Sequence, residues 1–149
     1  MEAQGSPIEA RVRHEIESLH EFFVGWFSGA LPERVFESSF LDRFAPDLVF
    51  IPPAGALLGL EHLSSSVRSG YGTNPAFRVQ IRAVRVRRHL DGHVLATYEE
   101  WQRNALASKP PDNGRVATVL FSSGEPLQWL HIHETWLPKE VMMAGPYDF

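Results

Sequence analysis

The sequence has no cysteine among its 149 residues. Disulfide bonds, thiolate catalysis and cysteine-based zinc sites are therefore excluded. No uninterrupted apolar run approaches the ~20 residues that a membrane-spanning helix needs, and residues 1–7 lack the basic start and apolar core of a signal peptide. These absences favour a cytoplasmic protein with no membrane partner.

The chain also lacks an excess of positive charge. Its 14 Lys and Arg residues are outnumbered by 18 Asp and Glu, which gives a formal net charge of −4. Because binding to phosphate backbones needs a net basic surface, we expect no nucleic-acid partner. The hydrophobic share of 44% is typical of globular proteins, and the length fits one domain over residues 1–149 with a substantial core.

The first half of the chain has a helical period. Ser6 and Pro7 favour a helix start, and apolar residues then recur at three- and four-residue steps as far as residue 30. We expect a shorter helix over 36–44, a strand over 48–51 that two prolines stop, a short return strand near 56–58 and a third helix over 61–69.

The second half has the two-residue period of strands. We expect long antiparallel strands from residue 77, over 93–106, over 115–122 and after the turn at 123–126, with the last strand ended by Pro138. The apolar positions change parity between Ile81 and Val84, which predicts a β-bulge near Ala83. Asp91 and Gly92 are typical of a hairpin turn.

The last strand contains the first candidate site. Successive side chains of a strand point to opposite faces, so one face carries Leu130, Ile132, Glu134 and Trp136 and the other carries Trp129, His131, His133 and Thr135. A carboxylate on an apolar face costs several kcal/mol unless it is paired or protonated. Glu134 is therefore the leading candidate for a functional residue.

The neighbouring strand offers a second carboxylate, because Thr97, Glu99, Trp101 and Arg103 share one face. If that face also points inward, Glu134 and Glu99 are the candidate catalytic residues, and the candidate ligand-binding residues are Trp26, Trp101, Arg103 and Trp136. The opposite facing brings in Tyr98, Glu100 and Gln102, and both facings remain open. The structural alternative is a buried Glu–Arg ion pair without a catalytic role.

Two imidazoles, His131 and His133, share a face of the last strand. This spacing occurs in metal sites, but no cysteine is present to complete a ligand set. An interface between two copies of the chain, lined by Trp129 and these histidines, is the favoured interpretation. We therefore expect a homodimer, no metal and no cofactor.

Two stretches resemble a known superfamily. Residues 44–55, with the sequence FAPDLVFIPPAG, and residues 59–63, with the sequence GLEHL, are similar to the nuclear transport factor 2-like superfamily, in its SnoaL-like and ketosteroid-isomerase-like branch. Residues 129–133 also resemble the last strand of the kinase association domain. The resemblance implies an α+β cone-shaped barrel, in which a strongly curved, mostly antiparallel sheet wraps around a long N-terminal helix. It also implies a pocket between them and a convex face that pairs with a second copy.

The resemblance leaves two kinds of function open, and it leaves open whether the chain is an enzyme. One is a small-molecule-binding protein, such as an isomerase, cyclase or dehydratase, that uses carboxylate acid–base chemistry on a small apolar, cyclic molecule. The other is a non-catalytic dimerisation or assembly module. Pro52 stands where ketosteroid isomerases carry their catalytic aspartate, so that role is not transferred.

Overall fold

The computed structural model describes residues 6–149, so the first five residues of the expected domain and most of the segment tested for a signal peptide lie outside it. The helices are α1 (Pro7–Ser28), η2 (Glu33–Val35), α2 (Phe36–Ser39), η3 (Leu41–Arg43), α3 (Leu60–Ser69) and α4 (Lys139–Ala144). The strands are β1 (Phe44–Ile51), β2 (Leu58–Gly59), β3 (Arg78–Leu90), β4 (His93–Arg103), β5 (Asn113–Ser122) and β6 (Gln128–Trp136). Within the described residues, no helix is long and apolar enough to cross a membrane.

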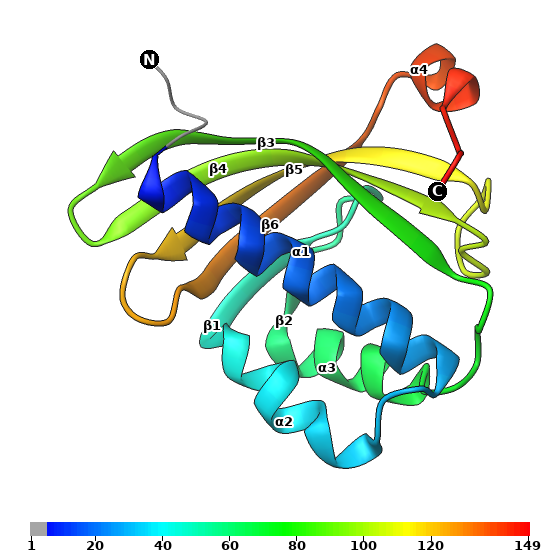
Figure 1. The fold of residues 1–149 in the computed structure, drawn as a ribbon, viewed down its shortest axis with the longest axis horizontal. Helices are drawn as coiled ribbons and strands as arrows, with labels where there is room; N and C mark the ends of the chain where they lie inside the picture. The colour runs from blue at the N-terminus through cyan, green and yellow to red at the C-terminus, as the bar shows by residue number, and fades with distance from the viewer. Residues whose placement is uncertain (1–5) are drawn as a thin grey trace.

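The six strands form one curved sheet in the order β2-β1-β6-β5-β4-β3. All neighbours are antiparallel except β1 and β6. Helix α1 runs across the concave face, and α2 and α3 lie together beside β1 and β2 (Figure 1). The predicted α+β class, long N-terminal helix and curved antiparallel sheet are confirmed. The sheet is open rather than closed into a barrel, with β2 and β3 as its edges.

Helix α1 begins where the sequence predicts. The Ser6 hydroxyl accepts a hydrogen bond from the backbone N–H of Glu9 at 3.2 Å, and Pro7 occupies the first turn. The helix ends at Gly29, whose φ of 80° is a left-handed conformation that glycine adopts at little cost.

An aromatic cluster joins α1 to the short helices and to β1. Phe22 stacks on Trp26 and on Phe40 at 5.5 and 5.4 Å between ring centroids, and Phe36 lies 5.0 Å from Trp26. Trp26 is fully buried, and its Nε1 donates to the carbonyl of Val67 at 2.7 Å, which ties α3 to the cluster. This core fixes one end of α1 against α3.

The predicted bulge in β3 is confirmed. The pairing with β4 shifts between Arg82 and Arg85, and Ala83 has a φ of 57°. The β3–β4 hairpin turns at Asp91 and Gly92, as predicted.

A second bulge, in β6, corrects the predicted facing of that strand. Trp129 pairs with Phe121 and His131 pairs with Leu120, so Leu130 is an extra residue between them. Trp129 therefore points into the core, where it is fully buried and donates to Glu15 at 2.8 Å. We expected Trp129 to lie on the outer face together with His131 and His133, and this prediction is wrong for Trp129.

The bulge at Ala83 leads to a test by substitution. An L-residue in the left-handed region costs about 1–2 kcal/mol, and glycine avoids that cost while losing about 0.5–1 kcal/mol of chain entropy. We expect Ala83→Gly to leave the free energy of unfolding unchanged or raised by up to about 1 kcal/mol. Ala83→Val should lower it by more than about 1 kcal/mol, because β-branched residues avoid positive φ. Chemical denaturation measures both, and equal effects would contradict this backbone conformation.

Candidate functional site

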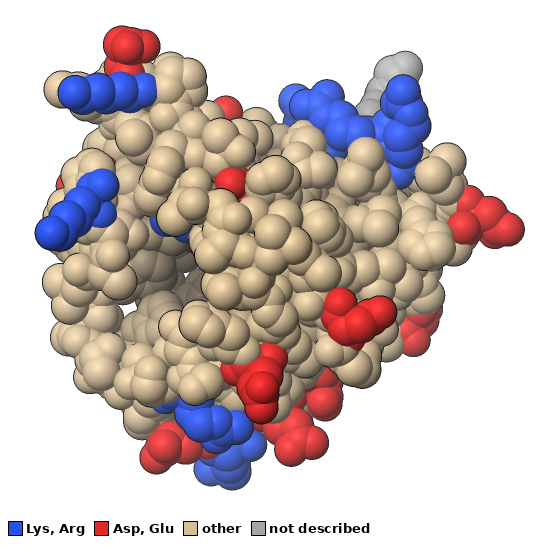
Figure 2. All heavy atoms as spheres, turned by 180° about the vertical axis from the view of Figure 1, so that it is seen from behind, with Lys and Arg blue, Asp and Glu red and all other residues tan. Residues whose placement is uncertain are grey.

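A cavity of about 290 Å³ lies between the concave face of the sheet, α1 and α3. Most of its wall is aromatic or aliphatic, and its polar side chains are His20, Ser66, Tyr98, Glu100, Gln102, Arg115 and Glu134. The rear face of the molecule is hollowed, and most of the rim of the hollow is uncharged (Figure 2). An apolar cavity with few converging polar groups is typical of small-molecule sites.

The polar side chains come from five different elements, with Ser66 on α3. His20 lies on α1, Arg115 on β5 and Glu134 on β6. Strand β4 supplies Tyr98, Glu100 and Gln102, which are in phase with the buried Val94 and Ala96. Each charged group therefore reaches the cavity from the inner, apolar side of its own element.

His20 and Glu100 form a buried ion pair. The His20 Nδ1 donates its proton to the carbonyl of Ile16 at 2.7 Å. The His20 Nε2 lies 3.1 Å from the Glu100 Oε1, so the proton between these two atoms is the second proton of the pair. Burial lowers the pKa of His20, but the charge and hydrogen bond of Glu100 outweigh it and raise the pKa overall. Burial likewise opposes ionisation of Glu100, yet the His20 charge holds the pKa of Glu100 at about 2.

Gln102 completes this pair by donating from Nε2 to the Glu100 Oε2 at 2.6 Å. Both oxygens of Glu100 are thus hydrogen-bonded, and the side chain is only 6% exposed. Glu100 is therefore a fixed negative charge near neutral pH.

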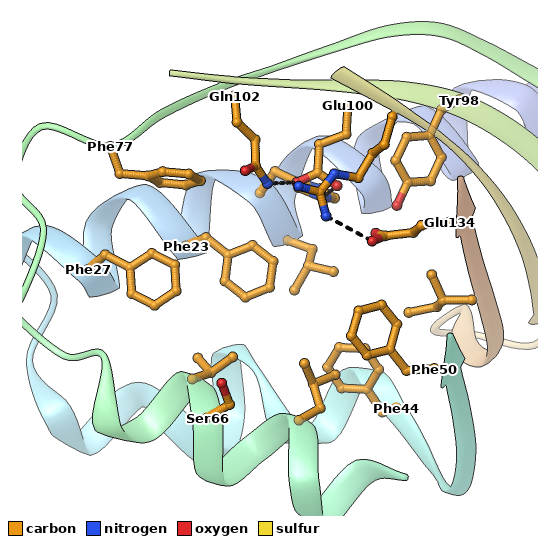
Figure 3. Close-up of a pocket in the computed structure, with 16 residues that line it drawn as sticks. Phe23, Phe27, Phe44, Phe50, Ser66, Phe77, Tyr98, Glu100, Gln102 and Glu134 are labelled. Carbon is orange, nitrogen blue, oxygen red and sulfur yellow. Dashed lines mark hydrogen bonds and ion pairs between the residues drawn. The ribbon is translucent and has the colours of Figure 1, made fainter. Parts of the chain in front are cut away.

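Glu134 pairs with Arg115 on the adjacent strand. An Arg115 guanidinium nitrogen donates to the Glu134 Oε1 at 3.0 Å (Figure 3). The other terminal nitrogen donates to Asn113 at 3.2 Å. The second Glu134 oxygen has no hydrogen-bond partner among residues 6–149 and is not enclosed by protein atoms. It is therefore free to contact a molecule in the cavity.

The pKa of Glu134 lies well above its usual value. Burial and then the negative charge of Glu100 raise the pKa of Glu134 to about 7, against the opposing effect of Arg115. A carboxyl with a pKa near neutrality can both accept and donate a proton at physiological pH. Glu134 is thus suited to general acid–base chemistry.

Tyr98 lies beside Glu134, and its hydroxyl points toward the same space (Figure 3). Burial, together with the charges of Glu100 and Glu134, raises the pKa of Tyr98 well above its usual value. The phenol therefore remains protonated and can donate a hydrogen bond to a ligand oxygen.

The candidate site residues of β4 were chosen on the assumption that Glu99 and Trp101 point inward, and this facing is wrong. The opposite facing, with Glu100 inward, is observed. Glu99, Trp101 and Arg103 lie on the outer face, where the Trp101 indole donates to Glu99 at 3.0 Å. Trp101 is buried there because the C-terminal segment covers it, with the Tyr147 ring at 5.7 Å. Arg115, and not Arg103, is the arginine that meets Glu134.

The two other tryptophans that we expected to bind ligand also lie outside the cavity. Trp26 belongs to the aromatic core next to it. Trp136 is 37% exposed at the end of β6, and the Arg115 guanidinium lies 4.8 Å from its ring centre. Among the predicted site residues, only Glu134 lines the cavity.

Sequence reasoning missed the roles of His20 and Arg115, although the sequence contains signals for both. His20 stands four residues after Ile16 on the apolar stripe of α1. Arg115 is in phase with Ala117 and Val119, which are buried on the inner face of β5. A search for charged residues in phase with apolar ones identifies both.

The described part of the chain contains no group of three His, Asp or Glu side chains that could hold a metal ion. The side chains in the cavity supply one titrating carboxyl paired with Arg115, one phenol and the fixed His20–Glu100 charge pair.

The raised pKa of Glu134 predicts a pH-dependent stability. The folded state holds this proton up to about pH 7, whereas the unfolded chain releases it near 4.5. The contribution of this proton to the free energy of unfolding is complete below pH 4.5 and is lost as the pH rises through 7, for a total on the order of 3 kcal/mol.

We expect the free energy of unfolding of the wild type to fall over this window relative to Glu134→Gln. Glu99→Gln, on the outer face, should keep the wild-type slope because Glu134 is intact. Urea denaturation at several pH values measures this. If the free energy of unfolding changed with pH equally in the wild type and in Glu134→Gln, the raised pKa of Glu134 would be contradicted.

Comparison with known proteins finds likeness in structure only. No protein-family model matches the chain, and no curated protein matches it. An NTF-2-like protein of unknown function from Pseudomonas aeruginosa has a TM-score of 0.75 at 25% identity, over 86% of this chain and 99% of that one. An uncharacterised protein with a cystatin-like fold from Caulobacter vibrioides has a TM-score of 0.63 at 17% identity, over 92% of this chain and 94% of that one. The CaMKII hub of S. rosetta has a TM-score of 0.66 at 11% identity, over 86% and 95% respectively. The superfamily expected from the sequence is therefore confirmed at the level of the fold: the chain is a protein of the nuclear transport factor 2-like fold.

Proposed function

We propose that the protein binds a small, largely apolar molecule with a carbonyl group and moves a proton on it, with Glu134 as the base. The observation that carries the proposal is the position of Glu134, a carboxyl with a pKa of about 7 on the wall of an apolar cavity of about 290 Å³. Perturbed carboxyls of this kind cluster at catalytic sites.

The step transfers one proton and needs no other reactant. The Glu134 carboxylate takes a proton from the carbon next to the carbonyl. The electrons of the broken C–H bond form a carbon–carbon double bond, and the π electrons of the carbonyl move to its oxygen. Tyr98 donates a hydrogen bond to that oxygen as its negative charge develops. Glu134 then returns the proton to the same carbon or, in a conjugated substrate, to another, which makes the reaction an isomerisation.

The surrounding residues have supporting roles. The His20–Glu100 pair keeps a negative charge near Glu134, and this charge contributes to the high proton affinity of Glu134. Arg115 limits this effect and holds the carboxyl in place through its hydrogen bond. The aromatic wall excludes water, so these charges act in a medium of low polarity.

The alternative function is an assembly module, which the likeness to the CaMKII hub suggests. An assembly module needs an interface on the outside of the sheet and a cavity that side chains fill. The open cavity and its titrating carboxyl favour the small-molecule function. A dimer that pairs through the outer face is compatible with either function.

The proposed chemistry is tested by hydrogen–deuterium exchange on 2-tetralone, a compact cyclic ketone with acidic protons beside its carbonyl. We expect the wild type to catalyse exchange in D₂O, at a rate that rises through about pH 7 as Glu134 loses its proton. Glu134→Gln should lower the rate by at least about a hundredfold. Tyr98→Phe should lower it by about a hundredfold, as expected for loss of an oxyanion donor.

Proton NMR follows this exchange directly. Glu99→Gln is the matched control, because Glu99 is a carboxylate of β4 that lies on the outer face. It should retain the wild-type rate. Exchange that is equally fast in Glu134→Gln would contradict the assignment of the base.

The homodimer remains a prediction. The outer face of the sheet carries half-buried apolar side chains, among them Leu95, Val116 and Leu120, and a second copy would cover them. Sedimentation equilibrium at micromolar concentration should give twice the chain mass. A monomer across this range would contradict the prediction.

A further inference from the structure

A second cavity adjoins the first at the end away from Glu134. It has a volume of about 320 Å³ and lies between the end of α3, the following loop and the loop over residues 104–112. We refer to it as the vestibule. The two cavities share five wall residues, namely Phe27, Ser66, Phe77, Gln102 and Arg115, so they meet at this ring of side chains.

The aromatic members of the ring stand opposite the acid–base end of the inner cavity, whereas Arg115 bonds Glu134 at that end. Phe27 and Phe77 lie at one end of the cavity, and Glu134 and Tyr98 lie at the other (Figure 3). A ligand whose carbonyl contacts Glu134 therefore has the rest of its length directed toward the vestibule.

The side chains at the ring favour an apolar ligand segment. The rings of Phe27 and Phe77 are in edge-to-face contact at 5.6 Å. The Gln102 amide already bonds Glu100, and the two terminal nitrogens of Arg115 bond Glu134 and Asn113, whereas the Arg115 Nε has no hydrogen-bond partner among residues 6–149. An ionic or strongly polar segment would have to compete with these bonds, whereas a methylene chain would not.

The vestibule wall is held in place by hydrogen bonds. The Asn74 amide donates to the Asn104 carbonyl at 2.8 Å, and the Asn104 amide donates to the carbonyl of Ala76 at 2.8 Å. The backbone N–H of Asn104 donates to Asp112 at 3.0 Å, which closes the base of the 104–112 loop. The vestibule is therefore a formed compartment of the fold.

The rim of the vestibule carries an apolar side chain that the protein itself does not cover. Leu106, in the 104–112 loop, lines the vestibule and is 73% exposed. Its neighbours Ala105 and Ala107 also line the wall. A ligand tail in the vestibule would cover this surface and gain from its burial.

We infer that the ligand is an elongated molecule, with a carbonyl head in the inner cavity and a flexible apolar tail that passes the ring into the vestibule. This inference rests on the proposed small-molecule function and specifies its ligand class. The ring then acts as the specificity determinant for chain length. Compact ketones fill only the inner cavity, and longer ones occupy both compartments.

Ser66 gives the means to block the passage. It is exposed on α3, and its hydroxyl makes no hydrogen bond to any residue from 6 to 149, so substitution should leave the fold intact. Ser66→Phe places a ring across the junction. Ser65→Phe is the matched control, because Ser65 is an exposed neighbour on the same helix that lines neither cavity.

The test measures the affinity of 2-pentanone, 2-heptanone, 2-nonanone and 2-undecanone by titration calorimetry. Each methylene that enters an apolar compartment should raise the affinity about fourfold. We expect the affinity of the wild type and of Ser65→Phe to rise through the whole series. In Ser66→Phe it should stop rising at the length that fills the inner cavity.

Two results would overturn the inference. One is a wild-type affinity that stops rising at the short ketones, and the other is an identical series for wild type and Ser66→Phe. Binding of no 2-alkanone would overturn both the inference and the proposed function. A length-dependent affinity without exchange on 2-tetralone would support the elongated ligand and contradict only the role of Glu134 as base.

Discussion

Four ionisable groups share one cavity of low polarity, and the properties of the site follow from how their charges are paired. His20, Glu100, Arg115 and Glu134 are each at most 9% exposed. Burial penalises every one of these charges, so each is stable only through a partner. His20 and Glu100 satisfy one another, and the resulting fixed charge on Glu100 acts on the next carboxyl, Glu134. The proton affinity of Glu134 is thus set by its own burial and by the charge of Glu100, with Arg115 opposing both.

The fold provides this arrangement because α1 lies across the sheet without filling its concave face. The aromatic cluster around Trp26 anchors the end of α1 against α3, and it leaves an open volume next to β4, β5 and β6. His20 comes from the helix and the three other charges from adjacent strands, so the network forms only when helix and sheet pack together. The network therefore belongs to the tertiary structure, and no single element contains it.

The sequence predicted local features well wherever one residue type determines the backbone. The Ser6 cap and the turn at Gly92 follow from such signals, and the bulge at Ala83 follows from the change of parity in the apolar pattern. The structure confirms all three. The facing of β4 could not be predicted with the same ease, because both of its faces carry aromatic and charged residues. We expected Trp101 to bind ligand on the inner face; it is buried, but on the outer face under the C-terminal segment. The bulge at Leu130 has no glycine or proline signal, so the inward position of Trp129 depends on tertiary packing alone.

Burial and the negative charge of Glu100 raise the pKa of Glu134 to about 7, and this pKa can be measured without any ligand. The measurement is a carbon-detected NMR titration of the side-chain carboxyl groups, with the Glu134 resonance assigned by its absence in Glu134→Gln. The account predicts that this resonance titrates with a midpoint near pH 7, and that the midpoint falls in Glu100→Gln, where the neighbouring negative charge is removed. A midpoint near 4.5 in the wild type would contradict the account, because Glu134 would then be an ordinary paired carboxylate without acid–base capacity at neutral pH.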